Sequence, residues 1–140
     1  MKSRTVRSLS CLMVLTILVA CSVLTPRSSG SLDGTSWVLE SYATTEPIPG
    51  TELTAEFEEG SIRGSSGCNS YGGSYQTDGR RIEIHELNST LMACLDPEGA
   101  MEQEAAFLRI LGDAQSYEII EGRLQILSSD GERLTFLPED

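Results

Sequence analysis

The chain has 140 residues, a length that accommodates one folded domain and little besides. It contains 10 Lys and Arg residues against 21 Asp and Glu residues, so its formal net charge is −11. This excess of acid excludes a surface built to bind nucleic acid, because such a surface needs clustered Lys and Arg to displace counterions from phosphate. We therefore expect no nucleic-acid partner.

The first 20 residues are typical of a secretory signal peptide. Three basic residues, Lys2, Arg4 and Arg7, precede an uncharged apolar stretch of about 12 residues, which is too short to cross a bilayer. Residues 18–21, Leu-Val-Ala-Cys, end this stretch and resemble the lipobox of bacterial lipoproteins. The resemblance implies cleavage before Cys21, diacylglycerol on its sulfur and acylation of the new amino terminus. The alternative is an ordinary signal peptide that happens to contain a cysteine.

Removal of residues 1–20 would leave 120 residues with seven basic side chains, all arginine, and a net charge of −14. Residues 21–32 are rich in Ser, Gly and Pro and predict a lipidated, flexible tether with a root-mean-square reach of about 18 Å. Residues 33–140 would form the folded domain. More than one acyl chain gives stable anchoring, so we expect the lipid on Cys21 to hold the domain at a membrane of the cell envelope. Ser22 replaces the aspartate that retains many lipoproteins in the inner membrane, which favours the outer membrane, facing the periplasm, if the host has two.

Alternating apolar and polar residues predict a series of short strands. The clearest case is Leu53, Ala55 and Phe57, which alternate with polar residues and are followed by a turn at Glu59-Gly60. Strands are expected at residues 35–42, 53–58, around Ile62, at 71–77, 81–87, 116–120, 124–128 and 133–137. One helix interrupts this series, and strands and helices do not alternate. The order predicts an α+β fold in which an antiparallel sheet curls around or against a single helix.

Residues 96–112 predict that helix. Asp96 stands where an N-cap residue would, Pro97 suits the first helical position, and Gly112 is a plausible end. On this interpretation Asp96→Ala would cost about 0.5–2 kcal/mol. The apolar face is assigned to Met101, Ala105, Leu108 and Leu111, with Phe107 beside them, and the wet side to Glu102, Gln103 and Arg109.

Three segments carry a family resemblance: residues 67–75 (Gly-Cys-Asn-Ser-Tyr-Gly-Gly-Ser-Tyr), 88–94 (Asn-Ser-Thr-Leu-Met-Ala-Cys) and 101–108 (Met-Glu-Gln-Glu-Ala-Ala-Phe-Leu). In this order and spacing they resemble the META domain of bacterial heat-inducible HslJ-type proteins, over about residues 32–137. The resemblance implies an open or cracked antiparallel barrel with one helix packed against it. It also implies an envelope location and a link to stress tolerance, and it brings no established enzymatic chemistry.

Cys68 and Cys94 are the cysteines left to pair in the mature domain, because Cys11 lies in the signal peptide and Cys21 would carry lipid. Export places them in an oxidising compartment, where a disulfide persists. The bridge would stabilise the fold by roughly 3 kcal/mol in the chain-entropy model. Two free buried thiols are one alternative. A redox-active pair is another, which the lack of a Cys-X-X-Cys motif disfavours.

The other candidate residues favour structural interpretations. Gly64, Gly67, Gly72 and Gly73 are more typical of bulges and close backbone approach than of a phosphate cradle. Asn69 is expected to bond its own backbone in a turn, and His85 to be a surface side chain on a strand. We therefore expect no catalytic, cofactor-binding or metal-binding residues and no cofactor.

Two functions follow from these expectations. The first is a non-catalytic envelope lipoprotein that acts as a binding or stress-protective module. The second comes from the family resemblance, because domains of this sort are similar in structure to pilotin lipoproteins: it is a pilotin-like or chaperone-like lipoprotein that holds a segment of a partner protein in a hydrophobic groove between helix and sheet. An enzyme ranks third.

Overall fold

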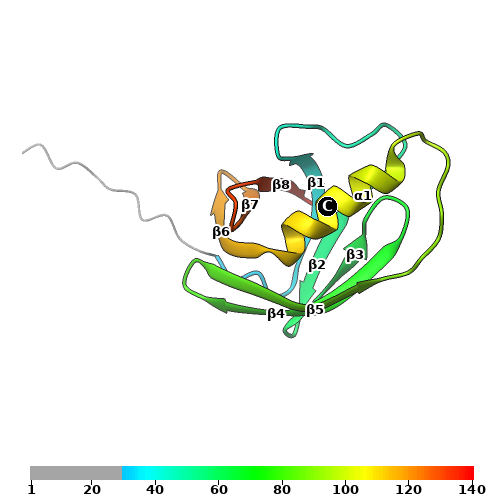
Figure 1. Ribbon diagram of the computed structural model, residues 1–140. Coiled ribbons are helices and arrows are strands. Elements are labelled where there is room, and N and C mark those ends of the chain that lie inside the picture. Colours follow the sequence, from blue (N-terminus) through cyan, green and yellow to red (C-terminus); the bar gives the residue numbers. More distant parts are fainter. Residues whose placement is uncertain (1–29) are drawn as a thin grey trace, which may run out of the picture.

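The computed structural model describes residues 30–140 and consists of eight antiparallel strands with one helix (Figure 1). The predicted signal peptide, Cys21 and most of the predicted tether lie outside these residues. The elements are β1 (Thr35–Tyr42), β2 (Thr54–Glu58), β3 (Ser61–Ser65), β4 (Ser70–Asp78), β5 (Arg81–Ser89), α1 (Ala100–Gly112), β6 (Ala114–Ile120), β7 (Arg123–Ser128) and β8 (Arg133–Pro138). The expected α+β barrel with a single packed helix is confirmed.

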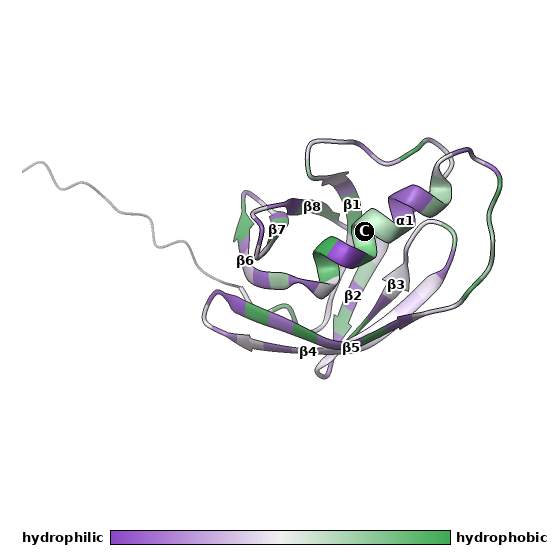
Figure 2. Cartoon of the chain, in the orientation of Figure 1, coloured by the Kyte–Doolittle hydropathy of each residue, from purple (hydrophilic) through white to green (hydrophobic). Residues whose placement is uncertain are grey.

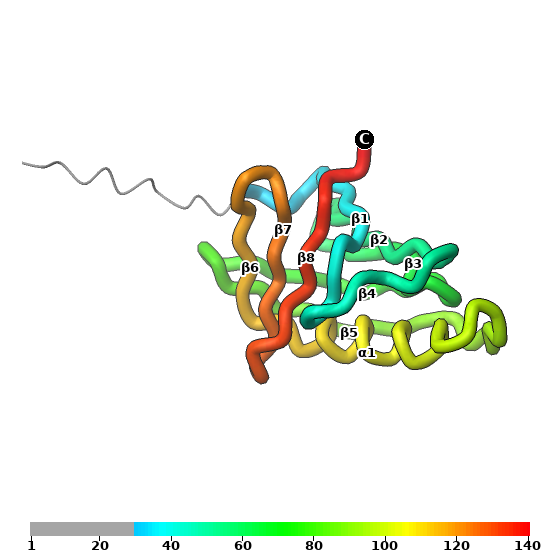
Figure 3. Tube along the Cα trace, turned by 90° about the horizontal axis from the view of Figure 1, so that it is seen from above, coloured from blue at the N-terminus to red at the C-terminus, as the bar shows by residue number. Residues whose placement is uncertain are grey.

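The strands follow one another around a closed barrel, and β1 pairs with β8 to complete the ring. The join between β5 and β6 is the narrowest, because Arg81 and Ser116 are its one registered pair. The helix α1 connects these two strands in the chain, lies beside β5 and also contacts β7 and β8 (Figure 3). The opening that the sequence predicts is therefore limited to this narrow join, which we call the β5–β6 seam.

The barrel interior takes its side chains from alternate positions of nearly every strand. Leu53 leads into β2, whose Ala55 and Phe57 are fully buried, while the residues between them face outward. The same alternation places Trp37 and Leu39 of β1 inside. Other interior side chains are Ile62, Tyr71, Tyr75, Ile82, Ile84, Tyr117, Leu124, Ile126, Leu134 and Phe136.

Phe107 closes the core from the helix side. Its ring is fully buried and makes edge contacts with Tyr71 and with Phe136, at centroid distances of 5.6 and 6.4 Å. Ile110 and Leu111 of α1 are also fully buried. The space between helix and barrel is therefore filled by the protein's own side chains.

The start of the helix differs from the sequence prediction. The helix begins at Ala100, and the N-cap is Gly99, which has a φ of 87° and makes no side-chain cap hydrogen bond. A left-handed N-cap of this kind suits glycine, which lacks the Cβ that would clash. Asp96 lies outside the helix, so the expected loss of a cap in Asp96→Ala does not apply.

The buried face of the helix also differs. Met101 and Leu108 are half-buried and Ala105 is exposed, whereas Gln103 is 2% exposed and Glu104 6% exposed. The buried positions are Ala100, Gln103, Glu104, Phe107, Ile110 and Leu111. These positions follow helical spacing, but two of them, Gln103 and Glu104, are polar. The sequence prediction places polar residues on the solvent-exposed side of the helix. Its apolar face is therefore rotated about the helix axis relative to the buried face in the structure.

The folded unit begins earlier than residue 33. Leu32 is 2% exposed and belongs to the core, and the carbonyl of Gly30 accepts a hydrogen bond of 3.1 Å from the Tyr117 hydroxyl. The last residues assigned to the tether are therefore part of the domain. Apolar burial outweighs the Ser- and Gly-rich composition at this boundary.

Two glycines allow close contacts between strands, as the sequence predicted. A Cβ on Gly64 of β3 would lie 2.1 Å from the carbonyl oxygen of Thr54, and one on Gly73 of β4 would lie 2.8 Å from that of His85. Gly73 also lies where the β4–β5 register shifts. Backbone contacts this short cannot be relieved by moving a flexible side chain.

Gly64→Ala should lower the free energy of unfolding by about 1–3 kcal/mol, because the methyl group would force β2 and β3 apart. Gly72→Ala is the matched control. Its Cβ would meet its nearest neighbour, the Ile62 carbonyl oxygen, at 3.8 Å, so stability should change by less than about 0.5 kcal/mol. Urea denaturation measures both, and equal stability of the two variants would contradict the assigned contact.

Candidate functional site

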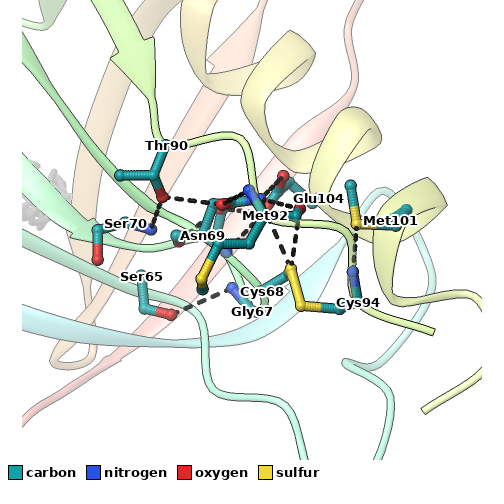
Figure 4. The surroundings of a disulfide bond; sticks show 11 residues. Ser65, Gly67, Cys68, Asn69, Ser70, Thr90, Met92, Cys94, Met101 and Glu104 are labelled. Atoms are coloured by element: carbon teal, nitrogen blue, oxygen red, sulfur yellow. Dashed lines mark hydrogen bonds between the residues drawn. A yellow bond between two sulfur atoms is a disulfide. The ribbon is translucent and has the colours of Figure 1, made fainter. Parts of the chain in front are cut away.

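Asn69, immediately before β4, is the centre of a buried hydrogen-bond network at one end of the barrel (Figure 4). Its side-chain nitrogen donates to Glu104 Oε1 at 2.8 Å and to the Met92 carbonyl at 3.1 Å. Its side-chain oxygen accepts from the Met92 amide at 2.7 Å and from the Thr90 hydroxyl at 2.8 Å. One amide group thus joins the turn before β4, the connection between β5 and α1, and the helix itself.

Glu104 is the helix residue that completes this network. Its Oε2 accepts hydrogen bonds from the Ser66 hydroxyl at 2.6 Å and from the Asn69 backbone amide at 2.8 Å. Burial of the carboxylate raises its pKa, but the hydrogen bonds from Ser66, from Asn69 and from the backbone of Cys68 outweigh burial and leave the pKa below its ordinary value. The carboxylate is therefore ionised at neutral pH, and hydrogen-bond donors from the turn surround it.

Gln103, the neighbouring residue of α1, holds a second turn. Its side-chain oxygen accepts from the Ile48 amide at 2.7 Å, and its side-chain nitrogen donates to the Thr51 hydroxyl at 2.9 Å. Ile48 and Thr51 belong to the connection between β1 and β2. Gln103 and Glu104 therefore bring the β1–β2, β3–β4 and β5–α1 connections together, and we call this end of the molecule the loop end.

A disulfide between Cys68 and Cys94 adds a covalent link at the loop end, with Cα atoms 5.9 Å apart (Figure 4). This is the pairing that the sequence predicts. It joins the turn before β4 to the β5–α1 connection, parallel to the hydrogen bonds of Asn69. The Cys94 amide also donates to the Met101 sulfur at 3.4 Å, which fixes the same segment to the first turn of α1.

The sequence does not predict this network. It predicts a local turn role for Asn69, but the Asn69 side chain bonds residues more than 20 positions away. The sequence gives no reason to single out Glu104, and it predicts that Gln103 faces solvent. The available signal was the spacing of positions 100, 103, 104, 107, 110 and 111, which fits one helix face once polar residues are allowed on it.

Several other candidates lie outside this network. His85 is exposed on β5, with its Nε2 atom 3.5 Å from Glu83 Oε2, in agreement with the predicted surface position. It lines an open groove of about 380 Å³ along the β5–β6 seam, between residues 81–85 and residues 112–115. Within residues 30–140, no group of three or more His, Cys, Asp and Glu side chains could hold a metal ion. No helix in the same range is long and apolar enough to cross a membrane.

The outward surface of the loop end is apolar at one place. Leu91, Met92 and Leu95, between β5 and α1, are 95%, 59% and 91% exposed. We call residues 91–95 the apolar loop. Figure 2 shows hydrophobic residues along this connection on the outside of the molecule. The buried network thus supports a segment whose large side chains face solvent.

The fold and this site define a small α+β barrel whose single helix braces three loops at one end. The META domain family model matches residues 30–140, and the chain belongs to this family. A search of curated proteins finds no match.

Solved structures show the same fold. A protein from Burkholderia xenovorans, determined by NMR, is 30% identical over 77% of this chain and 83% of its own, with a TM-score of 0.66. A second NMR structure is 24% identical over 76% of this chain and 90% of its own, with a TM-score of 0.62. A DUF4847 family protein from Bacteroides vulgatus shares the fold at 17% identity and a TM-score of 0.54, over 78% of this chain and 96% of its own.

Glu104→Gln should lower the free energy of unfolding at pH 7 by about 1–3 kcal/mol, because an amide would place a donor against the donors of Asn69 or Ser66. The pKa of Glu104 is lowered on folding, so its contribution is present above the ordinary value of 4.5 and is lost as pH falls through the folded-state pKa. The difference between wild type and variant should therefore shrink below about pH 4.5.

The matched control is Glu102→Gln, on the exposed side of the same helical turn. Its effect should stay within about 0.5 kcal/mol. Chemical denaturation at pH 7 and pH 3.5 measures both variants. A Glu104→Gln protein as stable as the control at pH 7 would show that the buried carboxylate does not hold the turn.

Proposed function

We propose that the protein is a non-catalytic binding protein of the bacterial cell envelope, anchored by lipid on Cys21 and protective under stress. The lipobox-like residues 18–21 support the anchor, and membership of the META family supports the envelope role. Outer-membrane placement, facing the periplasm, follows from Ser22 if the host has two membranes.

The observation that carries a binding role is the way in which the buried polar groups are used. Both polar side-chain atoms of Asn69, and both carboxylate oxygens of Glu104, form hydrogen bonds within this network. The lowered pKa of Glu104 leaves no proton on it to donate at neutral pH. This arrangement favours a support for the apolar loop over acid–base chemistry.

The second function, a pilotin-like protein with a groove between helix and sheet, has less support. Phe107, Ile110 and Leu111 fill the position that the partner segment would occupy. The groove at the β5–β6 seam is lined by charged residues, Arg81, Glu83 and Asp113 among them, and does not offer the hydrophobic lining that this function requires.

Cys21→Ala should abolish lipid attachment and either release the protein into the soluble fraction or leave it uncleaved. Cys11→Ala is the matched control, because Cys11 lies within the apolar stretch that would be removed. Fractionation of cells and intact-mass measurement of the mature protein check both variants. A Cys21→Ala protein that is processed normally and stays in the membrane would contradict the lipid anchor.

A further inference from the structure

The apolar loop exposes more hydrophobic surface than its position requires. Leu91 and Leu95 are 95% and 91% exposed, while the domain buries its other leucines, apart from Leu87, Leu108, Leu127 and Leu137, almost completely. Contiguous apolar side chains in solvent mark contact surfaces in soluble proteins. The loop therefore requires an explanation beyond the fold.

The backbone of the apolar loop is already held in place. The Asn69 side chain forms hydrogen bonds with both the backbone amide and the carbonyl of Met92, and Cys94 forms a disulfide with Cys68. The side chains thus project from a fixed frame, which lowers the entropy lost on binding. The backbone N–H and C=O of Met92 are already hydrogen-bonded to Asn69. This residue can therefore enter an apolar site without losing hydrogen bonds to water.

The surroundings of the loop are acidic. From residue 82 to residue 108 the chain has no Lys or Arg, and Asp96, Glu98 and Glu102 are exposed beside the loop. The β1–β2 connection at the same end contributes exposed Glu46 and Glu52. A complementary surface would carry Lys or Arg around an apolar centre. A second copy of this chain or an anionic bilayer would be repelled.

The apolar loop and the start of the described chain lie at opposite ends of the molecule (Figures 1 and 3). Gly30, which leads toward Cys21, accepts a hydrogen bond through its carbonyl from the Tyr117 hydroxyl of β6. If Cys21 is anchored, the domain is attached to that membrane from the end opposite to the apolar loop. This placement favours a protein in the surrounding compartment over the lipid of the anchoring membrane.

We propose that the apolar loop docks into an apolar pocket, bordered by Lys and Arg, on a partner protein. The inference rests on the proposed binding function and specifies its site and partner chemistry. Leu91 and Leu95 fill the pocket, and Asp96 and Glu98 pair with its rim.

Site-specific photocrosslinking in the native host tests this proposal. The full chain carries a benzophenone amino acid in place of exposed Ala93, which leaves Leu91 and Leu95 intact. Irradiation should give a protein adduct whose attachment site, mapped by mass spectrometry, lies in an apolar pocket with a basic rim. Leu91→Ser with Leu95→Ser should reduce the adduct about tenfold or more. Asp96→Asn with Glu98→Gln should weaken it at low salt and have less effect at high salt.

The matched control places the probe at Leu137 of β8, which is 39% exposed and lies outside the loop end. Adducts with lipid or with a second copy of this chain, no adduct, or an adduct unaffected by the serine substitutions would each overturn the proposal. The unfolding midpoint of the serine variant should match that of wild type, which separates lost docking from lost folding. A protein adduct formed from Leu137 alone would keep a binding function while contradicting its assignment to the apolar loop.

Discussion

The hydrogen bonds between the Asn69 amide and the Glu104 carboxylate are the interaction on which the loop end depends. A carboxylate that is 6% exposed and has no ion-pair partner within residues 30–140 is tolerable because neutral donors surround it. Those donors come from Ser66 and Asn69, in the turn before β4. The charge of Glu104 therefore fixes the turn, the turn positions Asn69, and Asn69 holds the β5–α1 connection.

Redundant support distinguishes this end of the molecule from the rest of the barrel. The disulfide and the Asn69 side chain link the same two segments, one covalently and one by hydrogen bonds. Gln103 adds the β1–β2 connection through a separate pair of bonds. By contrast, the β5–β6 seam has one registered pair. The family match covers residues 30–140, the whole barrel with its helix. The braced loop that exposes leucine is the feature on which the proposed binding role rests.

The strands could be predicted from the sequence, but the buried polar contacts of Asn69, Gln103 and Glu104 could not, for a physical reason. Period-two alternation in segments such as 53–58 records burial directly, and the β2, β7 and β8 bounds differ from the prediction by one residue at most. Gln103 and Glu104 violate the rule that polar residues face water, because their partners come from loops far away in the chain. The prediction for Asn69 differs from the structure for a similar reason, because asparagine side chains more often bond the nearby backbone in turns than distant loops. Leu32 falls in the predicted tether because the Ser- and Gly-rich composition around it conceals one buried side chain.

Hydrogen exchange of the Met92 amide tests the central claim most directly, because in the structure this amide donates to the Asn69 side chain. In wild type the amide should be protected. In Asn69→Ala that protection should fall to the level of an open loop, while the amide of Ile126, in the core strand β7, stays protected as an internal reference. Equal protection of Met92 in both proteins would contradict the account, because the loop would then be held without Asn69.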